Sequence, residues 1–529
     1  MLGDFTTRLR RIASWSLAAL IPTLTPHIAE ARWLRAESPQ FVVYSDGQET
    51  ELRDVTQKLE EYDALLRNIT GAKDKPFVNK LTIYLLPSNK EVREVAPRAS
   101  ESIQGFYTAG PAGTTTFAVR QDLGAGDWAS GQSIIFHEYT HHFAYQYFPA
   151  NYPTWASEGL AEYFSTAEMK DDKIEVGGFQ NGRVYPLRKR AWMPVKKLFN
   201  LGEAKGVDGR MVYPESWLVT HYLMDDPARQ KQMTNYLLAI GRGEQADQAF
   251  KTSFGMDYAG FDKVMKAYLK SSKIKVRSFP RMNQTPIELA VTTLPASADD
   301  LLLLNARFMS RSLAHQDEVD MRLGEKALQT VRKRAAKYPG DALAERTLAA
   351  AELLYGDVEK ADAMLDDLLD DLLARSPQDV DSLYLKAARY VLGGRWEPEQ
   401  RAALWAKAKP YAASIYKLDP NHYPALYLYA LGSLAQDGVP SENTMNASEL
   451  AHQLAPQVDE ITLETAVALS RAERAPAATR LLERVAFAPH ATAQSLYAKG
   501  LLDQVSAGKP VEHIPGEIPD VYEKAAASR

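Results

Sequence analysis

The chain has 529 residues, of which 45% are hydrophobic and 24% are charged, and its formal net charge is −5. This length exceeds what one hydrophobic core normally serves and predicts two or three domains of ordinary globular composition. The charge balance lacks the basic face of a nucleic-acid-binding protein, and the absence of cysteine excludes disulfides and thiolate metal ligands.

The first 31 residues have the layout of a secretory signal. Arg8, Arg10 and Arg11 precede the short apolar run 12–24, and small residues at 29–31 precede the next arginine. The run is shorter than a typical membrane-spanning helix, so an uncleaved membrane anchor is the less favoured alternative. We expect residues 1–31 to be a cleaved signal peptide, no later membrane span, and a periplasmic or secreted mature chain.

Residues 38–285 predict an α+β domain, with strands first and helices after. The apolar patterns predict strands at 41–46 and 80–88, a helix at 49–69, a hairpin at 105–119 and a helix at 131–147. Within the hairpin, we expect the strand 115–119 to be free to pair with an extended peptide.

The helix at 131–147 carries the motif "FHEYTHHF". His137 and His141 are four residues apart, so both imidazoles lie on one helical face and can bind one metal ion. Glu138 points about 100° round the helix, where it can take a proton from metal-bound water. This is the H-E-x-x-H pattern of zinc hydrolases, and the alternative is a helix whose histidines bind no metal.

A catalytic zinc ion usually has three protein ligands, and "PTWASEGLAEYF" at 153–164 offers the third. Thr154 is expected to cap a helix that contains Glu158 as the ligand. Gly159 has no side chain and would let this helix approach the His137 helix closely. Glu162, one turn beyond Glu158, is expected to orient a ligand imidazole. The alternative is an amphipathic helix with solvated glutamates.

The sequence "HEYTH" followed by "WASEGLAEYF" resembles the gluzincin metallopeptidases, the clan of thermolysin and aminopeptidase N. The resemblance implies a zinc peptidase in which Glu158 is the third ligand. "YPESWLVTHYL" at 213–223 resembles the segment whose tyrosine stabilises the oxyanion in the aminopeptidase N group. That role falls on Tyr213, and its alternative is a core tyrosine at a helix start.

The resemblance covers about residues 38–285 and is closest to bacterial peptidase MA-like domains. The G-x-M-E-N motif that holds a free amine in aminopeptidase N is absent, so aminopeptidase specificity does not carry over. His142 points away from the other two motif histidines, and His221 lies two turns beyond Tyr213. We expect both to pack rather than to bind metal.

The amino-acid pattern changes in the last part of the chain, where it predicts a succession of helices. Prolines recur at intervals of 38, 43, 36 and 33 residues, at Pro339, Pro377, Pro420, Pro456 and Pro489. This period predicts an all-α helix-pair solenoid over residues 301–510 that resembles degenerate tetratricopeptide repeats; a plain helical array is the alternative. We expect a linker at 286–300 and a tail at 511–529.

The sequence as a whole predicts an exported zinc metallopeptidase. Zn²⁺ held by His137, His141 and Glu158 would activate a water molecule, with Glu138 as general base. The expected partners are a peptide or protein substrate and a protein bound on the concave face of the repeats. Two alternatives remain: a scaffold whose helical repeats carry the function, and a metal-dependent amidase acting on the cell wall.

Overall fold

The computed structural model describes fifteen stretches of the chain, and the predicted signal at 1–31 lies outside them. The described residues are 33–72, 79–101, 103–120, 131–150, 152–178, 181–201, 206–271, 275–282, 287–310, 318–356, 358–434, 438–487, 492–509, 511–519 and 521–522. Among these residues, no helix is long and apolar enough to cross a membrane.

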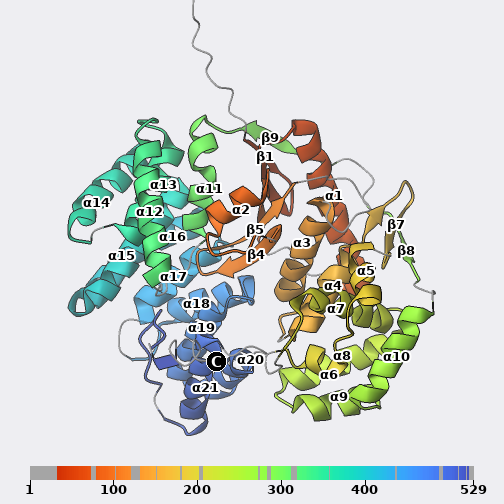
Figure 1. Ribbon diagram of the computed structural model, residues 1–529. Helices are drawn as coiled ribbons and strands as arrows, with labels where there is room; N and C mark the ends of the chain where they lie inside the picture. Colours follow the sequence, from red (N-terminus) through yellow and green to blue (C-terminus); the bar gives the residue numbers. More distant parts are fainter. Residues whose placement is uncertain are drawn as a thin grey trace, which may run out of the picture. The chain divides into compact units, whose positions relative to one another are not determined.

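A six-stranded mixed sheet organises the first part of the chain, in the order β4-β5-β3-β2-β1-β9 (Figure 1). Strands β2, β3 and β5 pair in parallel, and the remaining neighbours pair antiparallel. The strands are β1 (Leu34–Glu37), β2 (Phe41–Ser45), β3 (Leu81–Leu86), β4 (Gly105–Gly110), β5 (Gly113–Val119) and β9 (Ala290–Thr293). The predicted hairpin is therefore present as β4–β5, joined by Pro111 and Ala112.

The strand 115–119 was expected to be free for peptide pairing, and this expectation is wrong. It is part of β5, which is already paired with β4 on one side and with β3 on the other. In a sheet, a strand with two neighbours has no free row of backbone donors and acceptors. The edge strand on this side of the sheet is β4.

Side chains alternate between the two faces of the sheet, as a pleated strand requires. Val43 and Ile83 belong to the core formed with α1 (Glu49–Thr70) and α3 (Gly131–Tyr147). Tyr84 and its neighbour Tyr44 belong to a second core, which includes α2 (Asn89–Val95) and α11 (Ser297–Met309). The sheet thus lies between two helical layers.

A group of helices and a small sheet follow α3 and pack into the same core as α1. The helices are α4 (Thr154–Phe164), α5 (Asn181–Lys189), α6 (Val195–Phe199), α7 (Gly209–Met224), α8 (Pro227–Gly241), α9 (Ala246–Phe254) and α10 (Tyr258–Lys270). The small sheet has the order β6-β7-β8, with β6 (Glu168–Met169), β7 (Lys173–Val176) and β8 (Arg277–Pro280).

The last part of the chain is helical, as predicted. After α11 come α12 (Glu318–Ala335), α13 (Ala342–Tyr355), α14 (Val358–Arg375), α15 (Val380–Trp396), the 3-10 helix η2 (Pro398–Gln400), α16 (Arg401–Leu418), α17 (Tyr423–Leu434), α18 (Glu442–Leu454), α19 (Asp459–Arg471), α20 (Ala475–Ala486) and α21 (Ala493–Ser506). Pro339, Pro377, Pro420 and Pro456 lie in the turns before α13, α15, α17 and α19. These four therefore precede every second helix from α13 to α19. The fifth proline of the series, Pro489, lies outside the described residues, and the resemblance to tetratricopeptide repeats stays a prediction.

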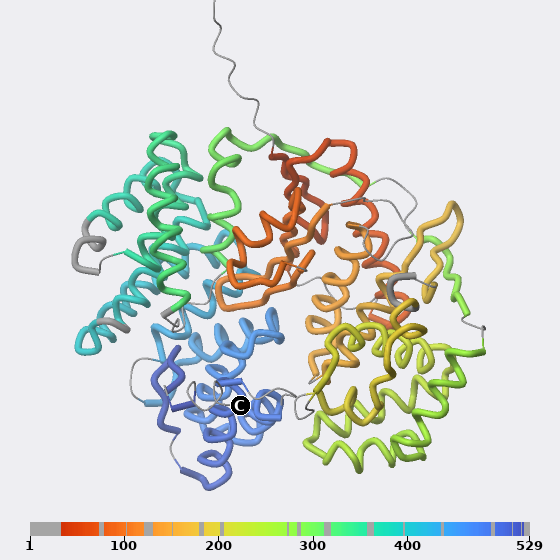
Figure 2. Tube along the Cα trace, viewed as in Figure 1, coloured from red at the N-terminus to blue at the C-terminus, as the bar shows by residue number. Residues whose placement is uncertain are grey.

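Two segments that were expected to be irregular contain ordered structure. Residues 290–293 of the predicted linker form β9 at the edge of the large sheet, and α11 begins at Ser297 (Figure 2). In the predicted tail, the His513 side chain is only 2% exposed and contacts Glu464 at 2.8 Å. Because α11 shares a core with the sheet, the two predicted domains are in direct contact. Their outer boundaries stay predictions.

Candidate metal centre

Helices α3 and α4 bring three candidate ligands together. His137 Nε2 lies 3.2 Å from His141 Nε2 and 3.2 Å from Glu158 Oε2, and His141 Nε2 lies 3.7 Å from the same oxygen. One ligand atom from each residue lies within 4.8 Å of the other two. Two imidazole nitrogens and one carboxylate oxygen make a common donor set for zinc.

The α3 helix is held in place by α1, through polar side chains of the motif itself. Tyr139 donates a hydrogen bond of 2.5 Å to Asp63, and the hydroxyls of Tyr62 and Thr140 are 2.7 Å apart. Arg67 donates a 2.7 Å hydrogen bond to the other oxygen of Asp63. The non-histidine positions of "HEYTH" therefore fix the helix that carries the ligands.

The second nitrogen of each candidate histidine ligand also has a partner. Glu162 Oε1 lies 3.3 Å from His137 Nδ1, at the place where the sequence predicted an orienting carboxylate. Ser157 Oγ lies 3.1 Å from His141 Nδ1, and the Tyr145 hydroxyl lies 2.8 Å from Ser157. Such partners fix the ring orientation of a histidine ligand and raise its basicity.

Ser157 and Tyr145 were missed in the sequence analysis, although helical spacing points to Tyr145. Ser157 directly precedes Glu158 on α4, and Tyr145 lies four residues after His141 on α3. A residue one turn beyond a ligand shares its helical face. The spacing alone does not say that the two helices meet at this point, so only the structure joins the two side chains.

Glu138 lies beside the three candidate ligands and is 9% exposed. Burial raises the pKa of its carboxyl, against the opposing effect of His137 and His141, and the backbone of Tyr107 hydrogen-bonds to it. Tyr107 belongs to β4, the edge strand. The carboxylate is thus placed between the motif helix and the free edge of the sheet.

Tyr213 lies at the open side of the cluster. Its ring centroid is 6.3 Å from that of His137, and its side chain is 40% exposed. It lies in the first turns of α7, one residue before Pro214. The structure therefore brings all six predicted site residues into one region, with Tyr213 the most accessible of the six.

Two expectations about α4 are wrong. Thr154 is the first residue of the helix rather than its cap, and the capping position falls on Pro153, which has no side-chain donor or acceptor. Gly159 does not face α3. A Cβ on Gly159 would lie 2.1 Å from Thr220 Oγ1 and 2.6 Å from the Ser216 carbonyl oxygen, so the glycine permits the close approach of α7. Because it is about 100° round the helix from Glu158, it cannot share the ligand face.

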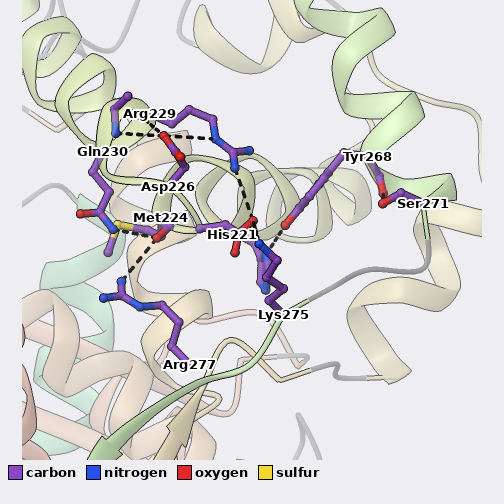
Figure 3. A network of polar contacts seen from close by, with 11 residues as sticks. His221, Met224, Asp226, Arg229, Gln230, Tyr268, Ser271, Lys275 and Arg277 are labelled. Atoms are coloured by element: carbon purple, nitrogen blue, oxygen red, sulfur yellow. Dashed lines mark hydrogen bonds and ion pairs between the residues drawn. The ribbon is translucent and has the colours of Figure 1, made fainter.

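The two remaining histidines near the motif pack, as expected. His142 is buried, its Nδ1 lies 3.3 Å from the Tyr107 hydroxyl, and burial lowers its pKa to about 3. His221 is 1% exposed, and its ring nitrogens contact the Tyr268 hydroxyl at 2.8 Å and the Gly177 carbonyl at 3.0 Å. Figure 3 shows His221 beside Tyr268, within a polar network that links α7 to α8, α10 and the chain before β8.

The residues of the cluster fit a divalent cation. Glu158 Oε2 is buried and accepts no hydrogen bond from any described residue, although it is in contact with both imidazoles. Burial would raise the pKa of Glu158, but His137 and His141 outweigh it, and the pKa is lowered. A buried carboxylate of this kind needs a positive partner, which a metal ion bound by the two histidines would supply.

One comparison with known proteins gives a match. Residues 64–271 match the Peptidase MA superfamily. The matched segment runs from α1 to the end of α10 and contains every candidate site residue. Neither a curated protein nor a solved structure matches the chain. The match supports a peptidase MA-like domain, and it is consistent with a metal-dependent peptidase acting on peptide bonds.

Proposed function

We propose that this chain is an exported zinc metallopeptidase of the gluzincin type. The observation that carries the proposal is the convergence of His137 Nε2, His141 Nε2 and Glu158 Oε2 within 4.8 Å. The match to the Peptidase MA superfamily over the same region supports it independently. Export rests on the predicted signal at residues 1–31 and places the mature chain in the periplasm or outside the cell.

His137, His141 and Glu158 would hold the zinc ion. When bound, the ion supplies a Lewis acid that polarises the scissile carbonyl and lowers the pKa of water toward neutrality. Glu162 and Ser157 hold the two imidazoles through their Nδ1 atoms, so that both Nε2 atoms stay directed at the same point. Proton transfer is then carried out by a side chain of the protein.

Glu138 is placed to act as the general base. Its carboxylate takes a proton from the attacking water and later delivers it to the leaving amine. The hydrogen bond from the Tyr107 backbone and the low exposure keep this carboxylate in one position. Tyr213, at the accessible side of the cluster, donates a hydrogen bond to the oxygen that becomes negative in the tetrahedral intermediate.

The test compares the mature chain with Glu138→Gln. Bound zinc is measured in both proteins by elemental analysis, and hydrolysis of a mixed peptide library is followed by mass spectrometry. Glutamine keeps the shape of the side chain but cannot accept a proton, so we expect equal zinc and a loss of hydrolysis of about 10²- to 10⁴-fold.

A control is His142→Gln, which changes a histidine of the same motif that lies outside the cluster. It should keep both zinc and hydrolysis. Equal hydrolysis by the native chain and Glu138→Gln would refute the assigned base. Failure of the native chain to take up zinc would refute the metallopeptidase itself and favour a scaffold role for the helices.

A further inference from the structure

The sheet face opposite α3 carries a row of stacked aromatic rings. Tyr44, Tyr84, Phe117 and Phe106 occupy directly paired positions on β2, β3, β5 and β4. Their successive ring centroids are 4.8, 5.2 and 4.9 Å apart, with interplanar angles of 9°, 15° and 26°. One end of this row, at Tyr44 and Tyr84, is left beside a cavity.

This cavity has a volume of about 880 Å³ and lies between the sheet and the C-terminal helices. Its walls come from β2, β3 and the β4–β5 turn on one side, and from α11, α13, α15 and α17 on the other. It is distinct from the candidate metal centre, because Val43 and Ile83 of the same strands face the core that contains α3. A volume of this size is typical of a site for a small ligand or a peptide segment.

Polar atoms without partners lie in the cavity wall. Tyr384 is 4% exposed, and its hydroxyl has no hydrogen-bond partner among the described residues. The same holds for Arg346 Nε and Gln40 Oε1. Buried polar atoms in folded proteins are nearly always paired. These three atoms are closed off from solvent, so each side chain would turn toward the cavity to pair with a ligand there. A peptide backbone, with alternating carbonyl and N–H groups, offers partners for both donors and for the acceptor.

The charges of the wall favour a cation. Its carboxylates are Glu37, Asp341, Asp381 and Asp419, and its cationic side chains are Lys80 and Arg346. Lys80 already pairs with Glu37, and Arg346 lies 2.6 Å from Asp379 and 3.9 Å from Asp381. The Arg346 guanidinium thus pairs with two carboxylates, and the Asp381 side chain is 50% exposed.

Asp381 lines the same cavity as the side chains of Tyr44, Tyr84 and His422. Its charge acts on the hydroxyls of Tyr44 and Tyr84, and on His422, whose pKa is lowered mainly by burial. Tyr384 lies one turn further along α15. A cavity that is lined by both a carboxylate and aromatic rings is a favourable site for an ammonium or guanidinium group, which can interact with both.

We propose that this cavity binds a peptide segment through a lysine or arginine side chain. The cationic group pairs with Asp381 among the tyrosine rings, and the backbone of the segment satisfies Tyr384, Arg346 and Gln40. An acidic segment is disfavoured by the excess of carboxylates in the wall. The inference is independent of the proposed hydrolysis, since none of these residues belongs to the metal cluster.

The test uses isothermal titration calorimetry with the full mature chain carrying Glu138→Gln, so that no peptide is consumed. The probes are blocked pentapeptides with a central lysine, arginine, norleucine or glutamate between alanines. We expect the lysine and arginine peptides to bind about tenfold more tightly than the norleucine peptide, and the glutamate peptide to bind least. Asp381→Asn should remove that preference.

Two further proteins and one further probe separate the outcomes. Asp503→Asn changes an exposed carboxylate on α21 and should leave binding unchanged. Tyr384→Phe should weaken all peptides by a similar factor, because it removes a backbone contact rather than the charge. Equal binding of the lysine and norleucine peptides, or an unchanged preference in Asp381→Asn, overturns the proposal. A higher affinity for spermidine than for the lysine peptide would overturn the proposal that the occupant is a peptide, and would assign the site to free polyamines.

Discussion

The side chains that anchor the motif helix and those that line the cavity differ in how their polar atoms are paired. On the α1–α3 side, Asp63 joins Tyr139 of the motif to Arg67, with the Arg67 and Asp63 side chains only 6% and 3% exposed. On the side of the C-terminal helices, Tyr384 and Arg346 line a cavity with polar atoms that have no described partner.

The difference corresponds to the different requirements of a catalytic cluster and a binding cavity. A catalytic cluster must hold its ligands in one geometry, so the surrounding side chains are tied to one another. A binding cavity must leave donors and acceptors for the ligand to use. Substitutions in the side chains that anchor the motif helix or hold the metal cluster should therefore lower stability or metal affinity. Substitutions in the side chains that line the cavity should change peptide binding.

The largest effect is expected for Asp63→Ala. It leaves the buried Arg67 guanidinium without its carboxylate and removes the acceptor of Tyr139, so the free energy of unfolding should fall by about 3–5 kcal/mol. Urea denaturation followed by circular dichroism measures it. The control is Asp54→Ala on the same helix, whose exposed pair with Lys58 should contribute less than about 1 kcal/mol. Equal losses in the two variants would show that α1 does not anchor the motif through Asp63.

A smaller effect, on metal affinity, is expected within the cluster. Glu162→Gln removes the charge beside His137, and Ser157→Ala removes the hydroxyl beside His141. Loss of such a partner weakens metal binding by about 10- to 100-fold, and the charged partner should matter more. Zinc competition with a chromophoric chelator gives both affinities. Unchanged affinity in Glu162→Gln would refute its orienting role.

Glu215 predicts a pH effect in the same region. It is 1% exposed, one oxygen accepts a hydrogen bond from the Met193 backbone, and burial raises its pKa to about 8. Because the folded pKa lies above the unfolded one, its contribution is fully present below about pH 4.5 and is lost as pH rises toward 8.

Glu215→Gln keeps the acceptor but has no proton to lose. Relative to the native chain, its free energy of unfolding should rise with pH, by an amount on the order of 2 kcal/mol between pH 5 and pH 7.5. Urea titrations at several pH values give the trend. The exposed Glu325→Gln on α12 is the control and should show no pH-dependent difference. A gain that stays constant with pH would contradict the buried-carboxyl explanation.

The sequence predicted local structure well where periodicity decides it. The motif helix at 131–147 and the hairpin at 105–119 are both present, and His137, His141 and Glu158 meet as their spacing and the resemblance implied. The sequence did not predict features that depend on packing between distant parts of the chain. Nothing local indicates that Gly159 faces α7, or that the linker adds strand β9 to the sheet.

The smallest effect is expected where the C-terminal helices meet the hairpin. The buried Tyr423 of α17 donates a 2.9 Å hydrogen bond to the Gly110 carbonyl, and its hydroxyl lies 2.9 Å from Thr114 Oγ1. Tyr423→Phe removes both contacts and should cost about 1 kcal/mol. Tyr429→Phe on the same helix is the control, because neither contact involves it.

Zinc affinity should be equal in Tyr423→Phe and the native chain, since Tyr423 acts on the end of the hairpin and not on α3 or α4. Urea denaturation and chelator competition on the same samples test both halves of this expectation. If the variant lost zinc while keeping its stability, the helices would be coupled to the metal cluster through β4, and the two faces of the sheet would not be independent.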